Sequence, residues 1–242
     1  MGNIWRMFKK EFGGFINAPS TYIFLIIFLI LGSCLFFYVS LFFRIGQASM
    51  GGFFVFVPWL FLFFIPAIAM RVWAEEKKTG TEELLMTLPV RDWEVVLGKY
   101  FASLVLVLLA LALTFPIPVM INMFVDPKTP IDWGPVWCGY LGSALLGASI
   151  LAIGAWASSL TQNQIIAFIL GCSISFGMII IGFPFISAFI PGGEVISQLS
   201  LYSHFLSMYR GILAMPDIVY YLSVIAFFLF LNIRSIESRK WS

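Results

Sequence analysis

The chain has 242 residues, of which 61% are hydrophobic and only 11% are charged, and its mean hydropathy is +0.99. Soluble globular proteins average roughly 45–50% apolar and about 25% charged residues, so this composition excludes a soluble domain and predicts an integral membrane protein. The net charge of +2 is too small to indicate a nucleic-acid partner. Cys34, Cys138 and Cys172 lie in or beside apolar runs without C-x-x-C spacing, which favours packing roles over a metal or redox centre.

Residues 1–19 predict an amphipathic helix lying in the membrane interface, because its apolar side chains recur on one face and its basic ones fall elsewhere. Asn17-Ala18-Pro19 should then turn the chain into the membrane. A cleavage-like box at Leu31–Cys34 is read as part of the following span, since the apolar run continues through Phe43. The residues expected at the interface are Trp5, Phe8, Lys9, Lys10 and Phe12.

Uncharged runs predict six membrane-spanning helices, because about 20 residues cross a bilayer. The charge-free stretch between Asp132 and Glu194 is long enough for two crossings, with the polar residues 161–164 as the turn between them. Pro116 and Pro118 should kink the third span or end it early. The predicted spans are 22–43, 53–70, 100–125, 136–159, 165–185 and 218–233, and together they form an all-α polytopic fold.

Basic residues near the span ends predict the orientation. With six spans, only Arg44, Lys128 and Arg210 fall on the outer side, and the other basic residues fall with the two termini. We therefore expect both termini in the cytoplasm of a bacterium whose inner membrane holds the protein.

The most highly charged stretch, Glu75 to Pro89, lies between spans two and three. Each charge at the bilayer centre would cost about 3 kcal/mol, so we expect the stretch to lie in water. Span two should continue as a helix through Lys78 and stop at Gly80. Thr81 can cap a short helix that ends at Pro89, and Asp92 can cap the next helix.

The predicted short helix carries Leu84, Leu85 and Leu88 on the cytoplasmic side. Leucines at this spacing are typical of a helix that docks in the groove of a partner. Packing on the protein's own spans or on the bilayer surface is the alternative.

The outer segment 186–217 predicts a short amphipathic or re-entrant helix that caps the outer mouth. Its polar stripe is flanked by apolar residues and contains Ser200, Ser203, His204, Ser207 and Arg210.

Two stretches resemble a known family. "RVWAEEKKTGTEELLMTLPVRDWEVVLGKY", from Arg71 to Tyr100, resembles the first cytoplasmic loop of ABC-2-type transporter permeases, especially the gliding-motility and copper-maturation (nitrous oxide reductase) group. "FKKEFGGFINAPSTYIF", from Phe8 to Phe24, resembles the interfacial elbow helix of those proteins.

The resemblance implies one transmembrane permease domain over 1–242, with an elbow at 1–19 and a coupling loop at 71–99. It also implies a dimer of permease halves, a route between them, outward transport and two ATP-binding subunits that carry ATP and Mg. A periplasmic accessory protein would be compatible with it. This non-enzymatic chain has no G-x-x-x-x-G-K-[ST] loop and no cofactor of its own. The implied contacts with the ATPase are Glu82, Glu83, Leu84, Leu85, Met86, Leu88, Arg91, Gln162 and Asn163.

The sequence supports three other functions less well. A secondary transporter or channel usually places ionisable groups within its spans, whereas the predicted spans contain none. An intramembrane enzyme would need a partner acid for His204, the sole histidine, and the sequence indicates none. A non-transporting scaffold is disfavoured by the lack of hydrophilic domains.

Small residues in span four permit either internal packing or contact between halves.

Overall fold

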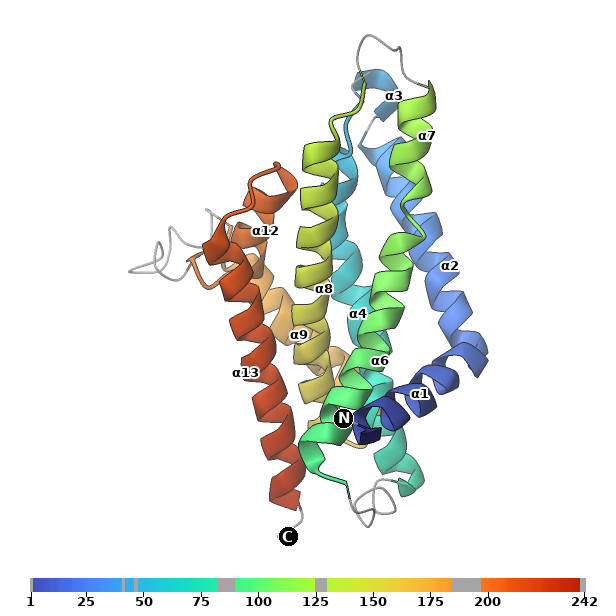
Figure 1. Cartoon of the computed structure of the whole chain (residues 1–242), viewed down its shortest axis with the longest axis vertical. Helices are drawn as coiled ribbons and strands as arrows, with labels where there is room; N and C mark the ends of the chain where they lie inside the picture. The colour runs from blue at the N-terminus through green and yellow to red at the C-terminus, as the bar shows by residue number, and fades with distance from the viewer. Residues whose placement is uncertain are drawn as a thin grey trace.

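The computed structural model describes residues 2–40, 42–45, 48–81, 90–124, 130–183 and 197–239, and these residues form helices and their connections, without a strand (Figure 1). Five helices are long and apolar enough to cross a membrane, and α9 (Gln164–Ile180) is a shorter apolar helix. The structure confirms the all-helical, multi-pass fold within these residues. A sixth crossing stays a prediction.

The N-terminal part consists of α1 (Gly2–Asn17), α2 (Pro19–Cys34), the π-helical stretch η1 (Leu35–Val39) and α3 (Phe42–Ile45). Pro19 occupies the first turn of α2, where its missing N–H has no intrahelical partner to lose. The first candidate span is Pro19–Val39, which covers the predicted span as far as Val39. The Ser40 N–H donates to the Leu35 carbonyl at the end of the π-helical stretch, and Phe42 belongs to a separate helix.

The central helix α4 (Gly51–Thr79) is continuous through the charged stretch that follows the apolar run. Gly80 ends it with φ of 72°, a left-handed conformation that glycine adopts without steric cost. This confirms the predicted extension and its stop. Pro66 inside the helix cannot donate to the Leu62 carbonyl, and the Cys172 thiol of α9 donates to that carbonyl instead, at 3.2 Å.

The third predicted span is divided into α6 (Asp92–Ala112) and α7 (Pro116–Phe124), which confirms the expected break near the prolines. The helix cap was misplaced by one residue. Arg91 is the N-cap and Asp92 is the first helical residue, because the Glu94 carboxylate accepts the backbone N–H of Arg91 at 3.1 Å.

Helix α8 (Trp133–Leu160) lies at the centre of the bundle and contacts α4, α6, α9, α12 (Leu201–Tyr209) and α13 (Met215–Arg239). A Cβ on Gly154 would lie 2.6 Å from the Ala69 Cβ, and one on Gly171 would lie 3.4 Å from the Gly154 Cα. These glycines therefore let α4, α8 and α9 approach closely. Of the two roles predicted for the small residues of span four, Gly154 serves internal packing.

Candidate functional site

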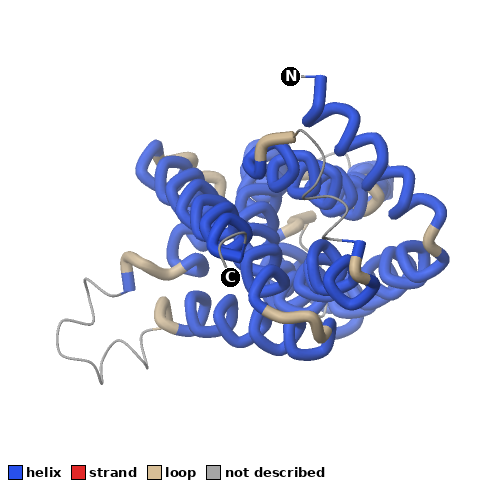
Figure 2. The backbone as a smooth tube through the Cα atoms, turned by 90° about the horizontal axis from the view of Figure 1, so that it is seen from below, coloured by secondary structure: helices blue, strands red, loops and turns tan. Residues whose placement is uncertain are grey.

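The charged end of the bundle gathers segments that are far apart in the sequence. The end of α4, the start of α6 and helix α1 lie together there, and the C-terminal end of α13 lies at the same end of the bundle (Figure 1). Figure 2, which views this end from below, shows α1 along the edge of the bundle.

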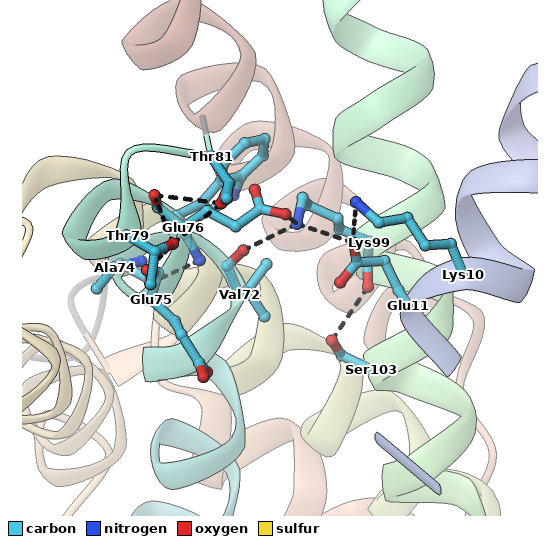
Figure 3. Close-up of polar contacts among 12 residues, drawn as sticks. Lys10, Glu11, Val72, Ala74, Glu75, Glu76, Thr79, Thr81, Lys99 and Ser103 are labelled. Atoms are coloured by element: carbon cyan, nitrogen blue, oxygen red, sulfur yellow. Dashed lines mark hydrogen bonds and ion pairs between the residues drawn. The ribbon is translucent and has the colours of Figure 1, made fainter. Parts of the chain in front are cut away.

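A buried ion cluster joins three of these helices. Lys99 of α6 is 1% exposed, and its Nζ lies 2.8 Å from Glu76 Oε1 of α4 and 3.1 Å from Glu11 Oε1 of α1 (Figure 3). It also donates to the Val72 carbonyl at 3.2 Å. A buried ammonium needs such partners, because leaving one charge unpaired would be strongly destabilising. We call Glu11, Glu76 and Lys99 the lysine cluster.

The end of α4 is also fastened to α8. The Ser158 hydroxyl donates to the Met70 carbonyl at 2.9 Å and accepts the Ala74 N–H at 3.0 Å. Met70 and Ala74 are i,i+4 partners of an α-helix, so this hydroxyl bridges one rung of the α4 backbone. Lys77 Nζ donates to the Ser159 carbonyl. Lys77 is 7% exposed, so the prediction that it lies in water was wrong, because α8 supplies an acceptor for its ammonium.

The turn between α8 and α9 lies beside the end of α4. A polar pocket of about 500 Å³ separates them, lined by Lys78, Gln162, Asn163, Gln164 and Ile165. Gln162 and Asn163 are both exposed, and the Asn163 side chain accepts the Ile165 N–H at 2.9 Å, which caps α9. The end of α4, which leads into the charged loop, and the 161–164 turn are thus adjacent in space at Lys78.

The predicted contact residues divide into two groups. Glu82, Glu83, Leu84, Leu85, Met86 and Leu88 lie outside the described residues. Arg91 is described and exposed, at the point where the loop re-enters α6. The loop's described ends, Thr81 and Val90, are therefore held by two helices that the lysine cluster ties together.

The predicted interfacial helix has two distinct sides. The rings of Trp5, Phe8 and Phe12 stack in sequence at 5.1 and 5.6 Å, and Trp5, Lys9 and Lys10 are exposed. On the other side, Met7 is buried against α6, where a Cβ on Gly98 would lie 2.8 Å from the Met7 Cβ. The sequence did not indicate a role for Met7, because a methionine that faces a glycine on a neighbouring helix can be recognised only once both residues are placed.

At the opposite end, the sole histidine does have a partner acid. His204 Nδ1 lies 2.6 Å from Asp217 Oδ1, which corrects the expectation that no acid is paired with it. Its Nε2 lies 2.8 Å from the Gln198 carbonyl oxygen. Both ring nitrogens are therefore engaged, and neither is available as the base of a serine nucleophile. In the described part of the chain, no group of three metal-ligand side chains comes together.

Within the described residues, five long apolar helices pack around a common centre and carry charged residues at one end, which defines a multi-pass membrane protein. The sequence matches the family described as ABC-2 family transporter protein over residues 45–234, which is well over half of the 242 residues. The chain therefore belongs to the ABC-2 transporter family, whose permeases work with an ATP-binding subunit. A direct search of characterised proteins finds no match.

Proposed function

We propose that this permease is driven by a separate ATP-binding subunit that docks on residues 82–88 and on the 161–164 turn. The observation that carries the proposal is the 500 Å³ pocket between Lys78 and the 161–164 turn. It supports the proposal because Lys78, at the end of α4 that leads into the loop, lies beside the 161–164 turn, so that a single partner could contact both segments. Arg91 would lie at the second end of the same loop.

Displacement of this surface would be transmitted into the membrane by its rigid connections. The α4 end is linked to α6 and α1 through the lysine cluster and to α8 through Ser158. A partner that moves the loop would therefore move several helices together. The elbow helix would share the movement because Glu11 belongs to the same cluster.

The assembled transporter would contain two permease halves and two ATP-binding subunits, with ATP and Mg on the latter and no cofactor in this chain. The route would lie between the halves, and outward transport is the direction that the family resemblance favours. We place the protein in a bacterial inner membrane with six spans and cytoplasmic termini, in the gliding-motility or copper-maturation group. A periplasmic accessory protein is compatible with this arrangement.

The docking role is tested by replacing Leu84, Leu85 and Leu88 together with Asp. A photo-crosslinker at Gln162 should capture a P-loop ATPase in the unmodified protein, identified by mass spectrometry, and the triple variant should lose that product. The matched control replaces Ile212, Leu213 and Met215 with Asp, since these exposed apolar residues lie at the other end, in the connection between α12 and α13 and at the first position of α13. Equal capture by both triple variants would refute docking on the leucines.

A further inference from the structure

The short helix α12 closes the end of the bundle opposite the charged site. The side chains of Leu201, Phe205 and Met208 are fully buried. Met208 packs closely on α8, because a Cβ added to Gly142 would lie 2.9 Å from the Met208 Cβ. The Ser200 hydroxyl donates to the Ile179 carbonyl of α9 at 3.1 Å. Helix α12 is thus a cap seated on α8 and α9, and it is also attached to α13.

His204 forms one part of the attachment to α13, beside the hydroxyls of Tyr220 and Tyr221, which donate to the Leu199 and Leu201 carbonyls. The ring contacts an oxygen at each nitrogen, Asp217 Oδ1 at 2.6 Å and the Gln198 carbonyl at 2.8 Å. The other Asp217 oxygen accepts the Ser207 hydroxyl. The ring also stacks on Tyr220 of α13, with centroids 4.0 Å apart. These contacts tie the turn before α12, α12 itself and the first turn of α13 into one unit.

Proton counting shows that this unit needs one more proton than a neutral histidine beside a carboxylate provides. A carbonyl only accepts, so Nε2 must carry a hydrogen to bond Gln198. A second proton must then lie between Nδ1 and Asp217 Oδ1, whichever of the two atoms holds it. Without that proton, only one ring nitrogen carries a hydrogen. The other nitrogen, Nδ1 or Nε2, then presents its lone pair to a lone pair of the oxygen that it faces.

We propose that His204, Asp217 and the Gln198 carbonyl form a proton-dependent latch that holds the α12 cap on α13. The latch is closed while the shared proton is present and opens when that proton passes to water. Opening is therefore favoured as pH rises. The proposal is independent of ATPase docking, because it involves the other end of the bundle.

The surroundings of the ring support a proton as the controlling species. From α13, the ring meets Asp217, the face of Tyr220 and the edge of Tyr221. An aromatic face stabilises a cation above it, and Asp217 lies in the first turn of its helix, where the dipole favours an acid. Within the described residues, the hydrogen bonds and ring contacts of the His204 ring involve Gln198 and α13 and no side chain of α4, α8 or α9.

The test uses the full chain in lipid nanodiscs and follows hydrogen exchange of the α12 amides at about pH 6 and about pH 9. After correction for the intrinsic exchange rates, we expect protection to fall roughly tenfold at the higher pH, the size of one lost charge-assisted hydrogen bond. The sole histidine can be labelled selectively with ¹⁵N, so loss of its ring proton can be read on the same sample.

Asp217→Asn is the decisive variant. Its amide can donate to a neutral Nδ1 while Nε2–H still bonds Gln198, so α12 should stay protected at both pH values with a singly protonated ring. Ser203→Ala, which removes a hydroxyl from the same helix that bonds only the Ser197 and Ser200 carbonyls, should keep the pH dependence of the unmodified protein.

Several results would overturn the latch. These are unchanged protection of the unmodified protein across this pH range, an Asp217→Asn variant that opens with pH as the unmodified protein does, or ring deprotonation at a pH distinct from the loss of protection. The last comparison needs no variant, so it decides the matter even if Asp217→Asn does not fold.

Discussion

Lys99 and Glu76 approach within 2.8 Å on two different helices, and the lysine is 1% exposed. A third helix joins them through Glu11. Because all three helices begin or end at the charged surface, this pairing couples the surface to helices that enter the membrane.

Lys99→Met should destabilise the protein by about 3 kcal/mol, because it leaves two carboxylates facing each other in a site with little access to water. The measurement is the thermal unfolding midpoint in detergent. Adding Glu76→Gln and Glu11→Gln should restore most of the loss. Lys10→Met is the matched control, since that side chain is 63% exposed and 4.0 Å from Glu11, and it should change stability by less than about 1 kcal/mol.

Gly154→Ala should cost about 1–3 kcal/mol, because the added methyl would lie 2.6 Å from the Ala69 Cβ at a crossing of close-packed helices. Gly177→Ala offers a comparison in the neighbouring helix α9, where a Cβ would have nothing within 4 Å. That variant should be neutral or more stable by up to about 1 kcal/mol through helix propensity. Similar unfolding midpoints for the two variants would contradict the packing.

Ser158→Ala should destabilise the protein by about 1 kcal/mol, because the Met70 carbonyl and the Ala74 N–H lose the hydroxyl that bridges them. Hydrogen exchange should rise at residues 70–77 and stay unchanged at residues 51–57 of the same helix. Ser223→Ala, which removes an exposed hydroxyl bonded to its own helix, is the control. A uniform increase along α4 would argue against a local bridge.

Cysteines at Lys78 and Ile212 should be labelled from opposite sides of the membrane. Both positions are exposed and lie at opposite ends of the bundle. The background should carry Cys34→Ala, Cys138→Ala and Cys172→Ser, the last keeping a donor for the Leu62 carbonyl. An impermeant maleimide added to intact cells should reach position 212 alone, and labelling of both would reverse the proposed topology.

Local signals allowed much of the fold to be predicted. Gly80 as a helix stop, Pro116 at a helix break and the polar turn at 161–164 each act through the backbone of their own segment. The first candidate span is described as far as Val39, although the apolar run continues to Phe43. Composition reports affinity for lipid and does not report where a helix stops.

Features that depend on distant contacts could not be predicted. Lys99 looks like an ordinary basic residue at a span end until Glu11, 88 positions earlier, is placed beside it. Lys77 likewise becomes buried only because a carbonyl of α8 meets it. The acid for His204 lies 13 positions away across a connection whose geometry the sequence does not reveal.

The close crossing of α4 at Pro66, Gly154 and Gly171 divides that helix into two arms of nearly equal length. At 1.5 Å per residue, about 20 Å separates Pro66 from Thr79 and about 22 Å separates it from Gly51. With that crossing as the fulcrum of a lever, a tilt of about 10° would carry the two tips about 3–4 Å in opposite directions. A displacement of the Thr79 end of α4 would then produce a displacement of nearly the same size, in the opposite direction, at its Gly51 end.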